Sequence, residues 1–381
     1  MLPSSPSRGI PAVVGCGEGL KIINNNDIVI VDGFTGVVEI NPDEETIRQF
    51  KIKQQAFLAK SNLLKSLKSV PTSTSDGKAL KLLANIGNAE ELEQVFENGG
   101  EGVGLLRTEL LFMNRDSFPT EEEQFDFYKE VAFKSRNVPV TIRTIDIGGD
   151  KHLPYFNLPP EQNPFLGYRA IRICLDRKDI FITQLKAILR ASAFGNFKIM
   201  FPMICNVQEI RSAKAVLAEA RAELERDQIN FDKNIEVGIM IEIPSAAVTA
   251  DILAKEVDFF SIGTNDLCQY TLAVDRMNEK IKDMYDPFNP GVLRLIHNVI
   301  IQAHKNGIHV ALCGELASDP MATLLLIGMG LKEFSMSAVS IPYIKSIMIN
   351  HSLTDSDAVL KNVMDMESSQ DIKTYLEGVN K

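Results

Sequence analysis

The stretch "VDFFSIGTND", residues 257–266, decides the fold. Val257 to Ile262 form an apolar run with one charge, and the run ends at Gly263. Short apolar runs bounded by glycine are typical of interior strands of a parallel sheet. Polar residues follow at once, and they include Asn265 and Asp266. The pattern therefore predicts a buried strand that holds polar side chains at its carboxyl end.

The same pattern recurs along the chain from Ala79 onward. Helical patterns, with apolar residues at spacings of three and four, alternate with β-rich runs. The eight runs are "LKLLANIG", "GVGLLRTE", "VPVTIRTIDIGG", "FKIMFPMI", "EVGIMIEIP", "VDFFSIGTND", "HVALCGE" and "EFSMS". The clearest helical patterns cover residues 206–227, 245–256, 290–307 and 320–329. Such units over about 270 residues predict an α/β fold, a (β/α)₈ TIM barrel of the usual size. An open doubly wound sheet is the competing architecture.

The first part of the chain belongs to no strand–helix unit. "DIVIVDGFTGVVEINP" pairs two β-rich runs across a turn containing Gly33 and Gly36, which predicts a β-hairpin. From Pro42 to about Lys68 the pattern is helical and charged, and "PTSTSDGK" after it indicates a loop. Short helices are expected in residues 351–381. The predicted domains are residues 1–42, a linker at 43–78 and the barrel at 79–381.

Composition narrows the class of protein. The chain has 381 residues, 45% of them hydrophobic, which is enough for a full-sized core. The net charge of -10, with no block of basic residues, argues against a nucleic-acid partner or a membrane-surface role. No run reaches the roughly 18 apolar residues of a membrane span. The five scattered cysteines indicate neither a disulfide framework nor a zinc site. We expect a cytoplasmic protein with no membrane insertion.

Polar and reactive residues collect where the predicted strands end. Barrel enzymes place their chemistry at the carboxyl ends of strands. Five of the runs end in such residues, namely Arg107, Arg143 with Asp146, Glu242, Asn265 with Asp266, and Cys313 with Glu315. A single strand-end charge is as compatible with simple solvation as with function. Five ends that converge on one mouth favour a functional site.

The residue types indicate what such a site binds. Glu242 and Asp266, on adjacent strands, suit a hard cation such as Mg²⁺. Arg107, Arg143 and Arg276 offer planar groups that bind phosphate or carboxylate. Together these residues predict a site for a small, anionic, metal-bound phosphate compound. The alternative is that the arginines only neutralise buried acids.

Two further residues are open to alternative interpretations. Cys313 is either a small core residue or a titratable acid beside the arginines. His152, in the loop after the third run, is either solvated or near the substrate.

Several stretches together resemble one family. They are "EGVGLLRTELLFMNRDSFPTEEEQF", "RTIDIGGDKHLPY", "NPFLGYRAIRI", "ILRASAFG", "IMFPMI", "VDFFSIGTNDLCQYTLAVDR", "CGELASDP" and "LKEFSMSAVSIP". From about Ile10 onward the chain resembles enzyme I of the bacterial phosphotransferase system, the phosphoenolpyruvate-protein phosphotransferases. Pyruvate phosphate dikinase and phosphoenolpyruvate synthase share the GTNDL-type strand end. The resemblance implies a phosphoenolpyruvate-binding TIM barrel, preceded by a linker helix and a hairpin remnant of a swivelling phosphohistidine domain.

The resemblance also implies a role for each strand-end residue. The residues implied to bind phosphoenolpyruvate are Arg107, Arg143, Asn265, Asp266 and Arg276. The implied Mg²⁺ ligands are Glu242 and Asp266. Cys313 is implied to be the proton donor that converts the enolate into pyruvate.

The partners follow from the same family. Its phosphoryl-accepting histidine lies in an N-terminal domain whose helical subdomain docks the carrier protein HPr, and neither segment is expected in these residues. The expected function is transfer of the phosphoryl group of phosphoenolpyruvate to a histidine absent from this chain, which then phosphorylates HPr in sugar uptake. A homodimer through the barrel is expected. The alternatives are a truncated, regulatory dimerisation module that binds phosphoenolpyruvate, and a relative of the dikinase or the synthase.

Overall fold

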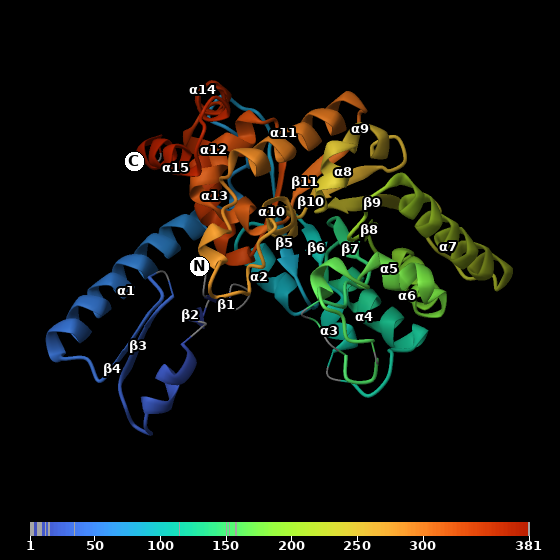
Figure 1. Cartoon of the computed structure of the whole chain (residues 1–381), viewed down its shortest axis with the longest axis horizontal. Coiled ribbons are helices and arrows are strands. Elements are labelled where there is room, and N and C mark those ends of the chain that lie inside the picture. The colour runs from blue at the N-terminus through green and yellow to red at the C-terminus, as the bar shows by residue number, and fades with distance from the viewer. Residues whose placement is uncertain are drawn as a thin grey trace.

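The predicted strands close into one parallel barrel, shown in a computed structural model (Figure 1). The structure describes residues 4–5, 10–11, 13, 16–33, 35–113, 115–149, 151, 153–156 and 158–379. The barrel strands are β5 (Lys81–Ile86), β6 (Val103–Leu106), β7 (Val140–Arg143), β8 (Phe197–Phe201), β9 (Glu236–Ile241), β10 (Phe259–Ile262), β11 (His309–Leu312) and β12 (Glu333–Met336). Each strand pairs with the next, and β12 pairs with β5, which closes the barrel. The TIM barrel is confirmed, and the open sheet is wrong.

Burial on both faces explains why these short apolar runs form strands. All four residues of β6, β7 and β10 are buried. Side chains that point inward form a small cluster inside the barrel, which consists of Leu105, Met200, Met240, Phe259 and Cys313. The larger core lies between the barrel and its helices. Cys313 therefore belongs to the interior filling of the barrel.

Helices surround the barrel (Figure 1). They are α2 (Glu91–Glu97), α3 (Glu109–Phe112), α4 (Glu121–Lys134), α5 (Ile171–Asp176), α6 (Lys178–Ser192), α7 (Val207–Arg226), α8 (Pro244–Val248), α9 (Ala250–Leu253), α10 (Thr264–Leu272), α11 (Pro290–Lys305), α12 (Pro320–Gly328) and α13 (Ile341–Asn350). The single helix predicted over 245–256 is wrong, since α8 and α9 are separate. They meet at Thr249, whose hydroxyl donates at 2.8 Å to the carbonyl oxygen of Ser245, which also accepts the amide of Thr249 at 3.0 Å.

A hairpin and a long helix project to one side of the barrel (Figure 1). Strands β3 (Val29–Asp32) and β4 (Val37–Ile40) pair antiparallel, which confirms the predicted hairpin. Helix α1 (Glu44–Lys65) follows and continues into the 3₁₀ turn η3 (Ser66–Ser69). Before the hairpin lie the short pair β1 (Ser4–Ser5) and β2 (Ile10–Pro11) and the 3₁₀ helix η2 (Gly17–Ile22).

The hairpin should exchange its amide hydrogens faster than the barrel. A two-stranded hairpin is at best marginally stable alone, and the side chains of Ile28 and Val37 are 58% and 42% exposed. Hydrogen exchange followed by mass spectrometry should show low protection for residues 29–40 and high protection for β8 and β9. Equal protection of hairpin and barrel strands would contradict the expectation.

The C-terminal residues form the expected short helices. They are α14 (Leu353–Met364) and α15 (Ser369–Val379), which pack on the barrel helices and bury Ile372 and Leu376. The described residues also form the 3₁₀ turns η4 (Pro164–Leu166), η5 (Lys282–Met284), η6 (Glu315–Ser318) and η7 (Ala338–Ser340). Among the described residues, no helix combines the length and the apolar character that a membrane span requires.

Candidate active site

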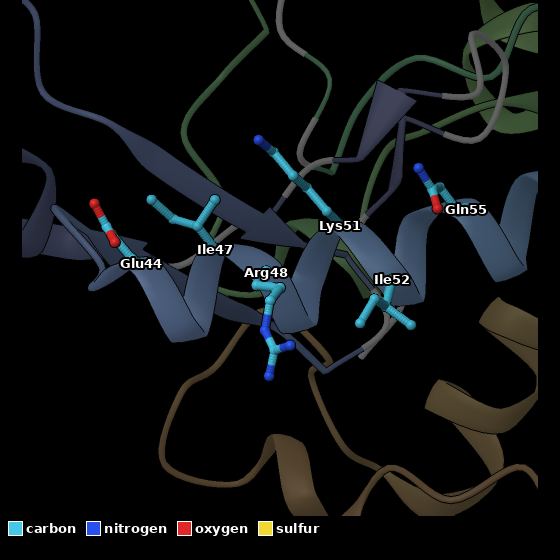
Figure 2. A pocket seen from close by; sticks show the side chains of 6 residues that line it. All are labelled: Glu44, Ile47, Arg48, Lys51, Ile52 and Gln55. Carbon is cyan, nitrogen blue, oxygen red and sulfur yellow. The ribbon is translucent and has the colours of Figure 1, made fainter.

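A hollow of about 410 Å³ lies along α1, away from the strand ends. Its lining residues are Glu44, Ile47, Arg48, Lys51, Ile52 and Gln55. Figure 2 shows Arg48 and Ile52 directed to one side of the helix and Lys51 to the other. Because all of the lining belongs to one exposed helix, no second wall encloses a ligand. The mouth of the barrel is the stronger candidate.

The structure brings the predicted residues to that mouth. Arg143 is the last residue of β7. Three others come directly after a strand, namely Arg107 after β6, Glu242 after β9 and Cys313 after β11. Since the strands are parallel, these positions share one end of the barrel.

Asn265 and Asp266 are placed differently from the prediction, which put them at a strand end. The chain turns at Gly263, and α10 begins at Thr264, so both residues lie in the first turn of a helix. The side-chain oxygen of Asn265 accepts a hydrogen bond from the amide of Glu315 at 2.9 Å, which ties α10 to the segment after β11. Arg276 lies in the loop after α10, with a guanidinium nitrogen 3.8 Å from Asp266 Oδ1.

Cys313 is a buried thiol surrounded by charges. Only 4% of the residue is exposed. Burial raises the pKa of its thiol, and the guanidinium groups of Arg143 and Arg107 oppose that shift only in part. The thiol is therefore protonated at neutral pH. A protonated group beside two arginines is able to donate a proton to a bound anion.

Arg143 is held in a buried ion network. Its guanidinium pairs with Glu109, and its Nη1 lies 3.2 Å from Asp146 Oδ2. Lys151 Nζ reaches the same two acids, at 2.9 Å from Glu109 Oε1 and 3.1 Å from Asp146 Oδ2. Burial alone would raise the pKa of both acids, but Arg143 and Lys151 outweigh it and lower the pKa of each. Charge neutralisation, the alternative raised by the sequence, therefore does describe Arg143.

A glycine turn and a further arginine extend this network. Gly148 has a φ of +98°, and its amide donates to the carbonyl oxygen of Lys151 at 3.1 Å, so the chain folds back on itself. Arg169 Nη2 lies 3.0 Å from Asp146 Oδ1 and 3.4 Å from Asp266 Oδ2. It thus links the loop after β7 to α10. The sequence interpretation missed Glu109, Lys151 and Arg169.

Arg107 differs from Arg143 in having no such network. It is exposed, and among the described residues its side chain has neither an ion-pair nor a hydrogen-bond partner. Arg276 is 33% exposed, and its contact with Asp266 is long. The buried Nε atoms of Arg143 and Arg169 also lack hydrogen-bond partners within the described ranges. The mouth therefore retains donors for an anion. His152 lies outside the described residues.

Glu242 is a buried carboxyl that faces other acids. It is 2% exposed, and its Oε1 accepts from the amide of Met203 at 2.7 Å. Burial raises its pKa to about 8, and the charges of Asp266 and Asp146 contribute. A Cβ on Gly263 would lie 3.0 Å from Glu242 Oε2, so a larger residue there would require the Glu242 side chain to shift by a few tenths of an ångström.

The carboxyls of Glu242 and Asp266 fit a hard cation. In the part of the chain that the structure describes, no three His, Cys, Asp or Glu side chains are grouped as metal ligands. A pair of carboxyls that repel each other suits Mg²⁺, which keeps water and substrate oxygens as its remaining ligands. A cation shared by Glu242 and Asp266 would remove the repulsion that raises the pKa of Glu242.

Replacing Glu242 by glutamine should stabilise the metal-free protein at pH 8. Because the pKa of Glu242 is raised to about 8, the folded chain binds a proton that the unfolded chain has lost. The free energy of unfolding of the wild type should therefore fall as the pH rises from about 4.3 to about 8. Glu242→Gln should gain on the order of a few kcal/mol at pH 8 and almost nothing at pH 4.5.

Urea unfolding in EDTA at both pH values measures this difference. Glu236→Gln is the matched control, since Glu236 lies at the opposite end of the same strand and is partly exposed. Equal stability of Glu242→Gln and wild type at pH 8 would contradict a raised pKa.

The fold and the mouth define a (β/α)₈-barrel protein that gathers basic groups and the carboxyls of Glu242 and Asp266 at the end of the barrel where its strands finish. The family described as "PEP-utilising enzyme, PEP-binding domain" matches residues 61–353. This chain belongs to that family.

Known relatives extend the comparison. The phosphoenolpyruvate-protein phosphotransferase of Priestia megaterium is 51% identical over 371 residues, which cover 97% of this chain and 65% of the relative. The protein of that name from Staphylococcus carnosus is 52% identical over 353 residues, which cover 93% of this chain and 61% of the relative. This chain thus spans a little under two thirds of their length. A solved structure titled as a citrate lyase from Burkholderia xenovorans covers 82% of this chain at 14% identity, with a TM-score of 0.47.

Proposed function

We propose that this chain binds phosphoenolpyruvate and Mg²⁺ at the barrel mouth and acts as the phosphoryl-donating part of a phosphoenolpyruvate-protein phosphotransferase. The observation that carries the proposal is the set of strand-end groups around Cys313, in which Arg107 has no protein partner among the described residues. The names of the relatives support it, since both are phosphoenolpyruvate-protein phosphotransferases. They favour this activity over that of a dikinase or a synthase.

The basic residues and the amide would hold the anionic substrate. Arg107 and Arg276 are the freer guanidinium groups, and they would bind carboxylate and phosphate oxygens. Arg143 would add a charge whose position is fixed by Glu109. The side-chain NH₂ of Asn265 would donate to the substrate, since its oxygen is already occupied by the amide of Glu315.

Glu242 and Asp266 would hold the Mg²⁺ ion. When bound, Mg²⁺ supplies positive charge that stabilises the phosphoryl oxygens and the leaving enolate. The chain's own contribution is to keep both carboxyls in place, Glu242 through the amide of Met203 and Asp266 through Arg169.

Cys313 would complete the reaction as an acid. Loss of the phosphoryl group to a histidine nitrogen breaks the bond between phosphorus and the enol oxygen and leaves the enolate of pyruvate. The thiol proton passes to the enolate carbon, which gives pyruvate and a thiolate. Arg143 and Arg107 lie close enough to influence the thiol and would stabilise the thiolate until it is protonated again.

The acceptor histidine would come from outside these residues. We assign residues 1–42 to a remnant of a phosphohistidine domain, 43–78 to a linker and 79–381 to the phosphoenolpyruvate-binding barrel. HPr would then receive the phosphoryl group from the histidine domain. The five cysteines are free, which fits a reducing cytoplasm.

A complementation assay tests this function. The chain is incubated with labelled phosphoenolpyruvate, Mg²⁺ and HPr, with or without a separately supplied histidine domain. Labelled HPr should form only when the histidine domain is present. Label on HPr without that domain, or no label with it, would overturn the proposal.

The barrel would also form a homodimer. Apolar side chains are exposed after two adjacent strands, namely Val248 and Ile252 after β9 and Met277 and Met284 after β10. Replacing Ile252 by lysine should shift the protein from dimer to monomer in analytical ultracentrifugation, because a charge placed in an apolar interface is costly. Phe133→Lys, which changes an exposed apolar residue on α4, is the matched control. A monomeric wild type would contradict the dimer.

A further inference from the structure

The loop between α10 and α11 carries Arg276 but has little regular structure of its own. Within this loop the regular element is the turn η5, and Met277 before the turn and Met284 at its end are 65% and 63% exposed. Arg276 is held by its backbone amide, which donates to Gln269 Oε1 at 3.2 Å. Among the described residues, the ion contact of its guanidinium is the long one with Asp266. The position of Arg276 therefore depends on how the two ends of the loop are fixed.

The far end of the loop is fixed on two sides. The hydroxyl of Tyr285 donates to the carbonyl oxygen of Asn265 at 3.3 Å, which ties the loop back to α10. The next residue, Asp286, accepts from the amide of Phe288 at 3.0 Å with its Oδ1. Phe288 is buried, at 2% exposure. The other carboxylate oxygen, Asp286 Oδ2, has its partner outside the loop.

That partner is Lys373 in the C-terminal helix α15. Its Nζ lies 2.7 Å from Asp286 Oδ2, across 87 residues of sequence, and 5.9 Å from the centre of the Phe288 ring. The side chains of the pair are only 34% and 19% exposed, so solvent screens the attraction less than at an open surface. Helix α15 is itself anchored, since Ile372 and Leu376 are fully buried. The helix is thus the fixed partner, and the loop is the part that it holds.

We propose that Lys373 is a positioning residue that fixes the Arg276 loop through Asp286 and so increases the affinity for phosphoenolpyruvate. The inference rests on the proposed function for its ligand. Without the ion pair the end of the loop is free to sample more conformations, and binding must then order it.

Hydrogen exchange tests, without any ligand, whether Lys373 fixes the loop. In Lys373→Met the amides of residues 276–288 should exchange faster than in the wild type, while β9 and β10 are unchanged. Lys373→Arg, which keeps the charge, should restore the slow exchange. Lys361→Met, which removes an exposed lysine from the neighbouring helix α14, is the matched control and should leave the loop unchanged. Unchanged exchange in Lys373→Met would overturn the proposal.

Calorimetric titration with phosphoenolpyruvate and Mg²⁺ tests whether fixing the loop increases the affinity for phosphoenolpyruvate. Lys373→Met and Asp286→Asn should each weaken binding about three- to fivefold, and the double variant should be no weaker than either single one. Lys373→Arg should bind within about twofold of the wild type, and the thermal midpoint of every variant should change by no more than about 2 °C. Lower thermal midpoints with unchanged affinity would assign Lys373 a merely structural role and overturn the proposal. A wild type that does not bind phosphoenolpyruvate would count against the proposed function, and exchange alone would then decide whether Lys373 fixes the loop.

Discussion

Replacing Cys313 by alanine is expected to slow the exchange of pyruvate methyl protons with D₂O by about 10²- to 10⁴-fold. A group that protonates the enolate must also remove a proton from bound pyruvate in the reverse direction. The raised pKa of Cys313 keeps the thiol protonated before the forward step, and it makes the thiolate, which is the form that removes the proton in the reverse step, a stronger base. Proton NMR of pyruvate in D₂O, with Mg²⁺ and the isolated chain, measures the rate without HPr or a histidine domain.

Cys205 provides the matched control for this experiment. It is a partly buried free thiol after β8, and it is no part of the interior cluster that contains Cys313. Cys205→Ala should exchange pyruvate protons at the wild-type rate, and both variants should bind phosphoenolpyruvate within about twofold of the wild type. Rapid exchange in Cys313→Ala would show that another group carries the proton.

The second large effect concerns stability. Arg143→Met should lower the free energy of unfolding by about 3–5 kcal/mol, because it removes one partner of a buried ion network. Glu109 would keep only Lys151, and one of its carboxylate oxygens already lacks a hydrogen bond among the described residues. Urea unfolding monitored by circular dichroism measures the loss.

Arg107→Met is the control, since it removes the same group from the same mouth. Arg107 is exposed and has no ion-pair partner within the described ranges, so its loss should change the free energy of unfolding by less than about 0.5 kcal/mol. Equal destabilisation by the two substitutions would contradict the account, in which the ion pairs of Arg143 stabilise the fold and Arg107 contributes little to stability.

The barrel could be predicted because its strands are buried on both faces. Runs such as residues 257–262 are therefore apolar without alternation, and the chemistry stands out where each run stops. The break at Thr249 could not be predicted, because no glycine or proline interrupts residues 245–256. The sequence analysis also missed that Asn265 lies in α10, because this helix starts directly after the strand.

The pairs of the ion network that involve Glu109 and Arg169 were missed because they join distant parts of the chain. Arg143 and Glu109 are 34 residues apart, and Arg169 and Asp266 are 97 apart. No local spacing connects them, and only closure of the barrel brings them together. One signal was available, because Glu109 follows Arg107 by two residues at the end of a predicted strand. The ligand roles of the strand-end residues stay predictions.

Calorimetric titration of the wild type and Arg107→Met with phosphoenolpyruvate, each with Mg²⁺ or with EDTA, tests the central claim most directly. The account predicts binding by the wild type that requires Mg²⁺ and that Arg107→Met weakens at least about tenfold while the protein stays folded. Absence of binding by the wild type in Mg²⁺, or binding that is indifferent to both Mg²⁺ and Arg107, would contradict it.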